Sequence, residues 1–165
     1  MKFTNTKTVR CAFISPWGPM TLAAHDTALV WVGFDGQKHA PDFSQWPTSP
    51  DHPLLQLACT QLQQYFAGER SSFDLPLDFS NGTEFQQRVW QRLLTIDPGA
   101  TTSYGAISEG IAQPRAVRAV GGAVGRNPIS IIVPCHRVVG RNGAMTGYAG
   151  GLARKVALLH LEGRK

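Results

Sequence analysis

A β-branched run that ends in Pro-Cys-His-Arg constrains this chain more than any other segment. Ile129 and the run 131–133 are strongly apolar, so we expect this segment to be buried. Pro134 has a fixed φ and no N–H, and it should therefore end any strand there. Cys135, the next residue, is expected at the mouth of a pocket rather than deep in a core.

The residues after Cys135 give it possible chemistry. A thiol is a weak nucleophile until it loses its proton, and a nearby imidazole or positive charge favours the thiolate. His136 and Arg137 supply both kinds of group. A single cysteine after an apolar run is, however, more often a small buried hydrophobic residue. This segment alone leaves a catalytic and a structural interpretation open.

Size and composition bound the class of protein. The chain has 165 residues, enough for one ordinary domain or two small ones, and 42% of them are hydrophobic. No run is long and apolar enough to span a bilayer, and the polar N-terminus has no secretion signal. Three cysteines without a secretory context indicate free thiols in a reducing compartment. We therefore expect a cytoplasmic protein with no membrane partner.

Charge divides the chain unevenly. Residues 1–80 hold five Lys or Arg against seven Asp or Glu, whereas residues 81–165 hold eleven against four. Most of the excess is arginine. An Arg-rich half indicates a polyanionic partner, nucleic acid first, although a solubilising surface would have the same composition.

The acidic half is predicted to be a small antiparallel sheet with one helix. Turn residues and apolar runs place strands at 11–14, 20–24, 28–34 and 72–79. Helical spacing predicts a helix over 54–66, which Gly68 should stop. A zinc site made of Cys11, His25, His39 and Cys59 matches no compact ligand spacing, so we expect no metal.

The basic half is predicted to be mostly helical. Thr83 should cap a first helix, and two short helices over 104–111 and 115–124 have the pattern of a helix-turn-helix, with Pro114 at the second helix start. Arg115 and Arg118 should share one face of the second helix. Its opposite, core-facing stripe should be Val117, Val120 and Val124. Small residues from Ala119 to Ala123 indicate close approach to another helix or to a nucleic-acid groove.

The C-terminal segment adds a glycine-rich loop and a last helix. The loop 145–151 carries one aromatic residue, Tyr148, suited to stacking on a planar ligand. The helix 152–161 should pack with Leu152, Val156, Leu159 and His160 near one face. Glu162 follows at the helix end, where the macrodipole does not favour a carboxylate, so we expect it to have a partner.

Several motifs in one order give these features a family resemblance. The chain resembles the O6-alkylguanine-DNA alkyltransferases, most densely from residue 82 to 163. The motifs are Asn127-Pro128, Pro134-Cys-His-Arg-Val138, Thr102-Ser-Tyr-Gly105, Arg118-Ala-Val-Gly121, Tyr148-x-Gly-Gly151 and Leu159-x-x-Glu-Gly163. The resemblance implies an α+β fold: a ribonuclease H-like N-terminal domain over residues 1–80, and a helix-turn-helix and catalytic domain over residues 81–165.

The resemblance also implies a role for each candidate residue. Cys135 would take the alkyl group from a flipped-out guanine, His136 would deprotonate it through a water, and Glu162 would orient His136. Asn127 would tie the second helix to the active-site loop. Arg118 would fill the gap that the flipped base leaves in the stack, and Tyr104 would lie at the target phosphate. The other DNA contacts would come from Ala119, Gly121 and Gly122 in the groove. The base pocket would be formed by Tyr148, Val138, Ala149 and Val124.

The implied partner is duplex DNA that contains O6-alkylguanine. The second helix would enter the minor groove, which carries little sequence information, and affinity would come mostly from phosphate contacts. No cofactor is needed. We expect a monomer and leave cooperative binding along DNA open.

Three other functions compete with this one. A non-enzymatic relative that binds alkylated DNA would lack the cysteine. A helix-turn-helix regulator would leave His136, Glu162 and Tyr148 without a task. A cysteine hydrolase or redox enzyme would turn over many substrate molecules, which a thioether on Cys135 does not permit.

Overall fold

Three antiparallel strands in sequence order form the N-terminal sheet of the computed structural model, which describes residues 7–163. They are β1 (Val9–Ser15), β2 (Gly18–His25) and β3 (Ala28–Phe34). The tight turn between β1 and β2 closes through Ser15, whose hydroxyl donates to the Gly18 carbonyl at 2.7 Å. These strands confirm three of the four that the sequence predicts.

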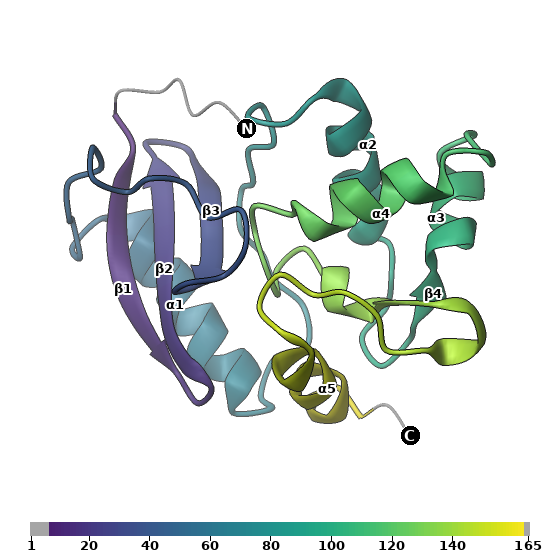
Figure 1. Ribbon diagram of the computed structural model, residues 1–165. Helices are drawn as coiled ribbons and strands as arrows, with labels where there is room; N and C mark the ends of the chain where they lie inside the picture. The colour runs from purple at the N-terminus through teal and green to yellow at the C-terminus, as the bar shows by residue number, and fades with distance from the viewer. Residues whose placement is uncertain (1–6, 164–165) are drawn as a thin grey trace.

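One helix covers a face of this sheet, as predicted (Figure 1). Helix α1 (Pro53–Phe66) starts with proline in its first turn, where a missing N–H costs nothing. Its buried side includes Leu55, Leu62 and Tyr65. Gly68 stops it with φ 75°, a backbone conformation that glycine adopts without strain.

The prediction of a fourth strand over 72–79 is wrong. This segment makes only one isolated bridge, between Leu29 and Leu77. The Pro76 carbonyl accepts from the Leu29 N–H at 2.9 Å, but Pro76 has no N–H with which to continue the hydrogen-bond ladder of a strand. The Gln61 side chain instead accepts from the Asp74 N–H at 2.9 Å and donates to its carbonyl at 3.1 Å.

The C-terminal half consists mainly of helices beside the sheet (Figure 1). Thr83 caps the first, as predicted, through a reciprocal capping box with Gln86, and Ser103 caps the second. The segment just before the second helix and the segment after Cys135 pair as two short parallel strands. The elements are α2 (Glu84–Leu93), β4 (Thr102–Ser103), α3 (Tyr104–Gly110), α4 (Val117–Gly125), η1 (Cys135–Arg137), β5 (Val138–Val139), η2 (Arg141–Gly143) and α5 (Leu152–Leu161).

Helix α4 begins later than predicted. Pro114 lies in a turn that the Ala116 N–H closes onto the Gln113 carbonyl at 2.9 Å. Arg115 therefore precedes the helix, and the predicted shared face of Arg115 and Arg118 is wrong. Val117 is also wrongly placed, because it is 41% exposed, whereas Val120 and Val124 are buried.

Helix α5 is present, but three of the four residues predicted for its packing face are wrong. Leu152 is 47% exposed, Val156 is 37% exposed, and His160 is exposed. The buried residues are Lys155, Leu158 and Leu159. Of the four predicted residues only Leu159 is buried, because the face toward the core is the one that carries Lys155 and Leu158.

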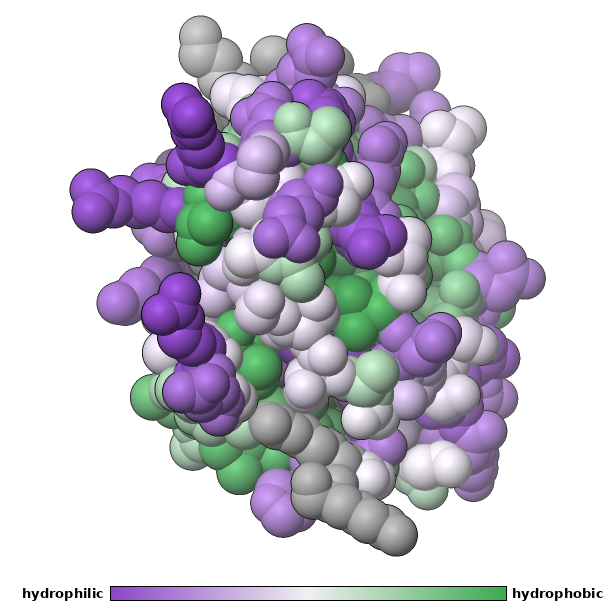
Figure 2. Space-filling view, turned by 90° about the vertical axis from the view of Figure 1, so that its right-hand side faces the viewer, coloured by the Kyte–Doolittle hydropathy of each residue, from purple (hydrophilic) through white to green (hydrophobic). Residues whose placement is uncertain are grey.

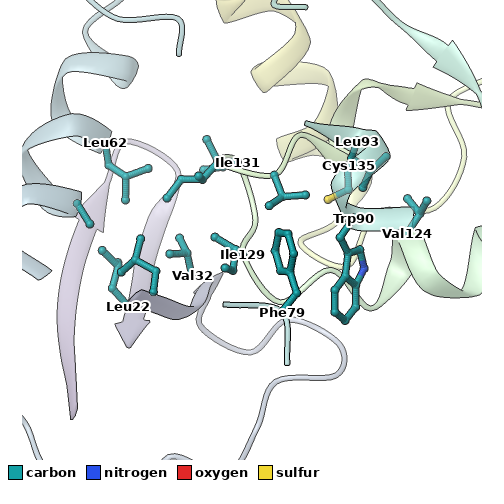
Figure 3. Close-up of a cluster of buried hydrophobic side chains, with 14 of the residues drawn as sticks. Leu22, Val32, Leu62, Phe79, Trp90, Leu93, Val124, Ile129, Ile131 and Cys135 are labelled. Atoms are coloured by element: carbon teal, nitrogen blue, oxygen red, sulfur yellow. The ribbon is translucent and has the colours of Figure 1, made fainter. Parts of the chain in front are cut away.

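The β-branched segment before Cys135 lies at the centre of a core that spans both halves. Figure 3 shows Leu22, Val32 and Leu62 on one side, Ile129 and Ile131 between, and Trp90, Val124 and Cys135 on the other. The segment is buried as predicted but forms no regular strand, since Ile131 has φ 75°. The Ser130 N–H instead donates to the Val32 carbonyl at 2.8 Å, which docks the segment on β3.

The α+β fold class is therefore confirmed, whereas the proposed division between residues 80 and 81 stays a prediction. Within residues 7–163, no helix combines the length and the apolar character needed to cross a membrane.

Candidate active site

Cys135 opens the short helix η1 and is only 4% exposed. The expectation that it lies at the mouth of a pocket is therefore wrong. The loop packs the thiol among apolar residues of the shared core, beside Leu93 and Trp90 (Figure 3). Burial raises the pKa of the Cys135 thiol to about 11, although the Asn127 amide and the positive charge of Lys155 both act to lower it. The thiol consequently needs a base to react near neutral pH.

Asn127 joins the end of α4 to the active-site loop. Its Nδ2 donates to the Val133 carbonyl at 2.8 Å and to the Sγ of Cys135 at 3.0 Å. Its Oδ1 accepts from the Ile129 N–H at 3.0 Å. The side chain is buried, so these bonds hold the loop with both of its polar ends satisfied.

His136 and Glu162 form the pair that the sequence predicts. The Nε2 of His136 lies 2.8 Å from the Oε1 of Glu162, and the two side chains are 0% and 2% exposed. Burial lowers the pKa of His136, so the imidazole is neutral at neutral pH. A neutral ring that donates from Nε2 to the carboxylate keeps a lone pair on Nδ1, which is buried and has no partner among the described residues.

Two further residues hold Glu162, and the sequence analysis gave neither this role. Arg137 makes a two-pronged contact, with Nε to Oε2 at 2.9 Å and Nη2 to Oε1 at 2.8 Å. The hydroxyl of Tyr65, which lies on α1 in the other half of the chain, donates to Oε1 at 2.7 Å. Burial alone would raise the pKa of Glu162, but the bonds from His136, Arg137 and Tyr65 hold it well below its usual range. The predicted partner of Glu162 is thus a network of three donors.

Lys155 is a fully buried cation that the sequence analysis also missed. Its ammonium donates to the carbonyl oxygens of Val138 and Thr146, each at 2.6 Å. It therefore fixes both ends of the loop that carries Arg141–Gly143. The available signal was spacing, because Lys155 lies three and four positions before Leu158 and Leu159 and so shares a helical face with them.

The predicted base-pocket residues differ in their burial. The Tyr148 hydroxyl is buried with no partner among the described residues, and burial raises its pKa, with the Cys135 thiolate acting in the same direction. Ala149 is half-buried beside it, and Val138 is buried with its carbonyl on Lys155. Val124 is buried in the core on α4. Tyr148 is thus close enough to Cys135 for the two groups to interact electrostatically.

The predicted DNA-binding residues gather on α3 and α4. Arg118 and Ala119 are exposed, whereas Gly121 and Gly122 are half-buried. The ring of Tyr104 lies against Gly121, where an added Cβ would come within 3.9 Å of Cδ1. Figure 2, viewed onto the side of the molecule that carries α3 and β4, shows a pale middle with hydrophilic side chains projecting around it. The small side chains of Ala119, Gly121 and Gly122 on α4 leave room for close approach of another surface.

Three of the four residues considered as zinc ligands make other contacts. Cys11 and Cys59 are in contact, and His25 bonds to Asp78 at 2.8 Å. In the part of the chain that the structure describes, no three Cys, His, Asp or Glu side chains gather as metal ligands.

Comparison with known families decides the assignment. The 6-O-methylguanine DNA methyltransferase DNA-binding domain matches residues 84–164, and the ribonuclease-like domain of the same family matches residues 9–79. The chain belongs to the 6-O-methylguanine DNA methyltransferase family. This membership confirms the resemblance that the motifs indicated.

Curated relatives of the family match nearly the whole chain. The methylated-DNA–protein-cysteine methyltransferase of Mycobacterium tuberculosis is 53% identical over 148 residues, which cover 90% of this chain and 88% of that protein. The protein of the same name from Methanosarcina acetivorans is 49% identical over 152 residues, covering 92% and 96%.

Solved structures of this family agree. The crystal structure of the Mycobacterium tuberculosis O6-methylguanine methyltransferase has a TM-score of 0.86 at 50% identity, covering 94% of this chain and 92% of that one. A crystal structure of the Mycobacterium tuberculosis protein in complex with DNA has a TM-score of 0.85 at 50% identity, covering 92% and 90%.

Proposed function

We propose that this protein repairs DNA by moving the alkyl group of O6-alkylguanine onto the Sγ of its own Cys135. The observation that carries the proposal is the buried Cys135 thiol beside the His136–Glu162 pair. In the reaction, a bond forms between Sγ and the alkyl carbon while the bond from that carbon to O6 breaks. The guanine keeps the electron pair of the broken bond and a proton replaces the alkyl group. A thioether has no easy leaving group, so each molecule reacts once.

His136 acts as the base in this reaction. The proton of Cys135 passes to the free lone pair on Nδ1 through a water, while Nε2 keeps its bond to Glu162. The imidazolium that forms lies 2.8 Å from a carboxylate with a lowered pKa, which stabilises it. Tyr65 and Arg137 position that carboxylate without contacting the substrate.

The target guanine reaches Cys135 from outside the duplex. Its alkylated atom cannot be reached inside the base stack and Cys135 is only 4% exposed, so the base must leave the duplex to meet the thiol. Tyr148 then forms one wall, next to Val124. The backbone carbonyls near Cys135 and Val138 accept from the guanine amine, and the Ala149 N–H donates to O6.

DNA binds across α3 and α4. Helix α4 enters the minor groove, where Ala119, Gly121 and Gly122 allow close approach. Arg118 fills the gap left by the flipped base, and Tyr104 crowds the target phosphate. Binding of this kind has little sequence preference and weakens with salt. The monomeric state and the cytoplasmic location stay predictions.

The competing functions explain fewer of these contacts. A non-enzymatic relative that senses alkylated DNA has no use for a thiol held by Asn127. A helix-turn-helix regulator has no use for the buried network around Glu162. A hydrolase needs an intermediate that water can release, which a thioether does not offer.

The test separates transfer from binding. Cys135→Ser should abolish transfer from an O6-methylguanine duplex while its affinity for that duplex stays unchanged. Transfer that survives in this variant would show that Cys135 is not the acceptor.

A further inference from the structure

Two cysteines outside the active site lie in direct contact. Cys11 comes from the edge strand β1 and Cys59 from α1, and their Sγ atoms are 3.8 Å apart. Both are free thiols. They are 48 positions apart in the sequence, so the fold brings them together. Neither residue takes part in the proposed alkyl transfer.

The two thiols are chemically unequal. Cys11 is 6% exposed, whereas Cys59 is only partly buried and is therefore the one that a reagent reaches first. The hydrogen bond between them raises the pKa of Cys11, with burial adding to it, and lowers the pKa of Cys59. Cys59, which is the more exposed thiol and has the lowered pKa, is therefore the better nucleophile of the pair.

We propose that Cys11 and Cys59 are a dithiol that closes to a reversible disulfide when the protein meets a small-molecule disulfide, while Cys135 stays reduced. The thiolate of Cys59 attacks one sulfur of the small disulfide and releases one small thiol. Cys11 then gives up its proton and attacks the Cys59 Sγ, which releases the second small thiol. Two protein thiols are oxidised and one small disulfide is reduced, so the exchange balances.

Little movement is needed to form this bond. A disulfide has an S–S length of about 2.05 Å, so the two sulfurs must approach by roughly 1.8 Å from their present 3.8 Å. The product would tie the edge strand of the sheet to the helix that covers it. That helix also carries Tyr65, so the cross-link fixes the element that reaches Glu162.

Cys135 is protected from the same reaction by its surroundings. It is 4% exposed, and its Sγ accepts from Asn127 rather than lying against another thiol. Burial also keeps it in the unreactive thiol form near neutral pH. Selective closure of the first pair would leave the acceptor for alkyl groups free.

The test is oxidation of the full-length protein with excess glutathione disulfide. The intact mass should fall by about 2 Da, the mass of two hydrogens, and a reducing agent should restore it. Trypsin cleaves after Arg10, Lys38 and Arg70, so the cross-link should join peptide 11–38 to peptide 39–70. Titration of the unfolded, oxidised protein should find one thiol, in the peptide that contains Cys135.

Two variants sharpen the result. Cys135→Ser should lose the same two hydrogens, whereas Cys59→Ser should lose none and keep Cys11 as a thiol. A stable glutathione adduct on Cys59 with Cys11 still free, a cross-link that involves Cys135, or no reaction at all would overturn the proposal. These readouts do not depend on alkyl transfer, so they stand apart from the test of the proposed function.

Discussion

The side-chain amide of Asn127 lies 3.0 Å from the Sγ of Cys135, although eight positions separate the two residues. The same Nδ2 bonds to the Val133 carbonyl, and Oδ1 accepts from Ile129. One side chain at the end of α4 therefore holds the whole turn that presents the thiol. A shift of α4 on binding DNA would be transmitted directly to Cys135.

Removing this connection should affect both stability and reactivity. Asn127→Ala leaves the Ile129 N–H buried without a partner, whereas the Val133 carbonyl still accepts from the Cys135 N–H, so the free energy of unfolding should fall by about 1–3 kcal/mol. It also removes a hydrogen bond that lowers the pKa of Cys135, so the pH at which alkyl transfer reaches its maximum rate should rise. Urea unfolding and a pH–rate profile measure the two effects. The exposed Gln91→Ala on α2 is the control; equal behaviour of the two variants would contradict the proposed role of Asn127.

The hydroxyl of Tyr65 should matter to the reaction although it belongs to the N-terminal half. Tyr65→Phe keeps the ring packed but removes the 2.7 Å bond to Glu162. A lost bond worth about 1–2 kcal/mol corresponds to roughly 5- to 30-fold slower single-turnover transfer. Because Glu162 orients His136, the pH–rate profile should change as well.

Thr60→Ala, on the same helix and partly exposed to solvent, is the control for Tyr65→Phe. If Tyr65→Phe has the same transfer rate and the same pH–rate profile as the unmodified protein, the role of Tyr65 is limited to packing.

Glu162 should make the fold sensitive to acid. Its pKa is lower in the folded than in the unfolded protein, so its contribution is fully present above the unfolded value of about 4.3 and is lost as the pH falls below it. Glu162→Gln should cost about 3–5 kcal/mol at neutral pH, because Arg137 loses its buried partner. This difference from the unmodified protein should shrink below about pH 4.

Urea unfolding at several pH values measures that difference, with the exposed Glu109→Gln as the control. A difference that stays constant down to acid pH would mean that the ionised carboxylate of Glu162 does not stabilise the fold.

Arg118 should matter on duplex DNA and not on the free base. The side chain is exposed and carries no contact needed for the reaction at Cys135. Arg118→Ala should slow transfer from a duplex by about 10-fold, because the variant loses roughly 1–2 kcal/mol of the free energy that stabilises the flipped-out base. Its reaction with free O6-benzylguanine should stay unchanged. Arg141→Ala removes an exposed charge outside α4 and is the matched control; equal slowing on both substrates in Arg118→Ala would contradict a base-flipping role.

Local signals in the sequence were enough to predict the strands β1–β3, the caps of α2 and α3, and the pairing of His136 with Glu162. Each depends on residues close in sequence or on a family motif. The strand over 72–79 failed because alternation says nothing about whether a neighbouring strand is available, and Pro76 removes a donor. The predictions that Val117 and Leu152 face the core failed because helical periodicity gives a stripe of residues without saying which stripe faces the core.

Contacts between distant segments were the part that the sequence could not supply. Tyr65 and Glu162 lie 97 positions apart, and Cys11 and Cys59 lie 48 apart. Periodicity identifies Tyr65 and Cys59 as residues of an amphipathic helix but does not identify what they touch. The burial of Cys135 likewise depends on how β3 docks against the segment 128–133.

The most direct test of the central claim is the intact mass of the protein after reaction with a duplex that contains one O6-methylguanine. We predict that the mass rises by a single methyl group, that peptide mapping locates it on Cys135, and that repair stops at one lesion per protein molecule. Continued repair beyond one equivalent, or tight binding to the lesion with no change in mass, would contradict the proposed transfer to Cys135.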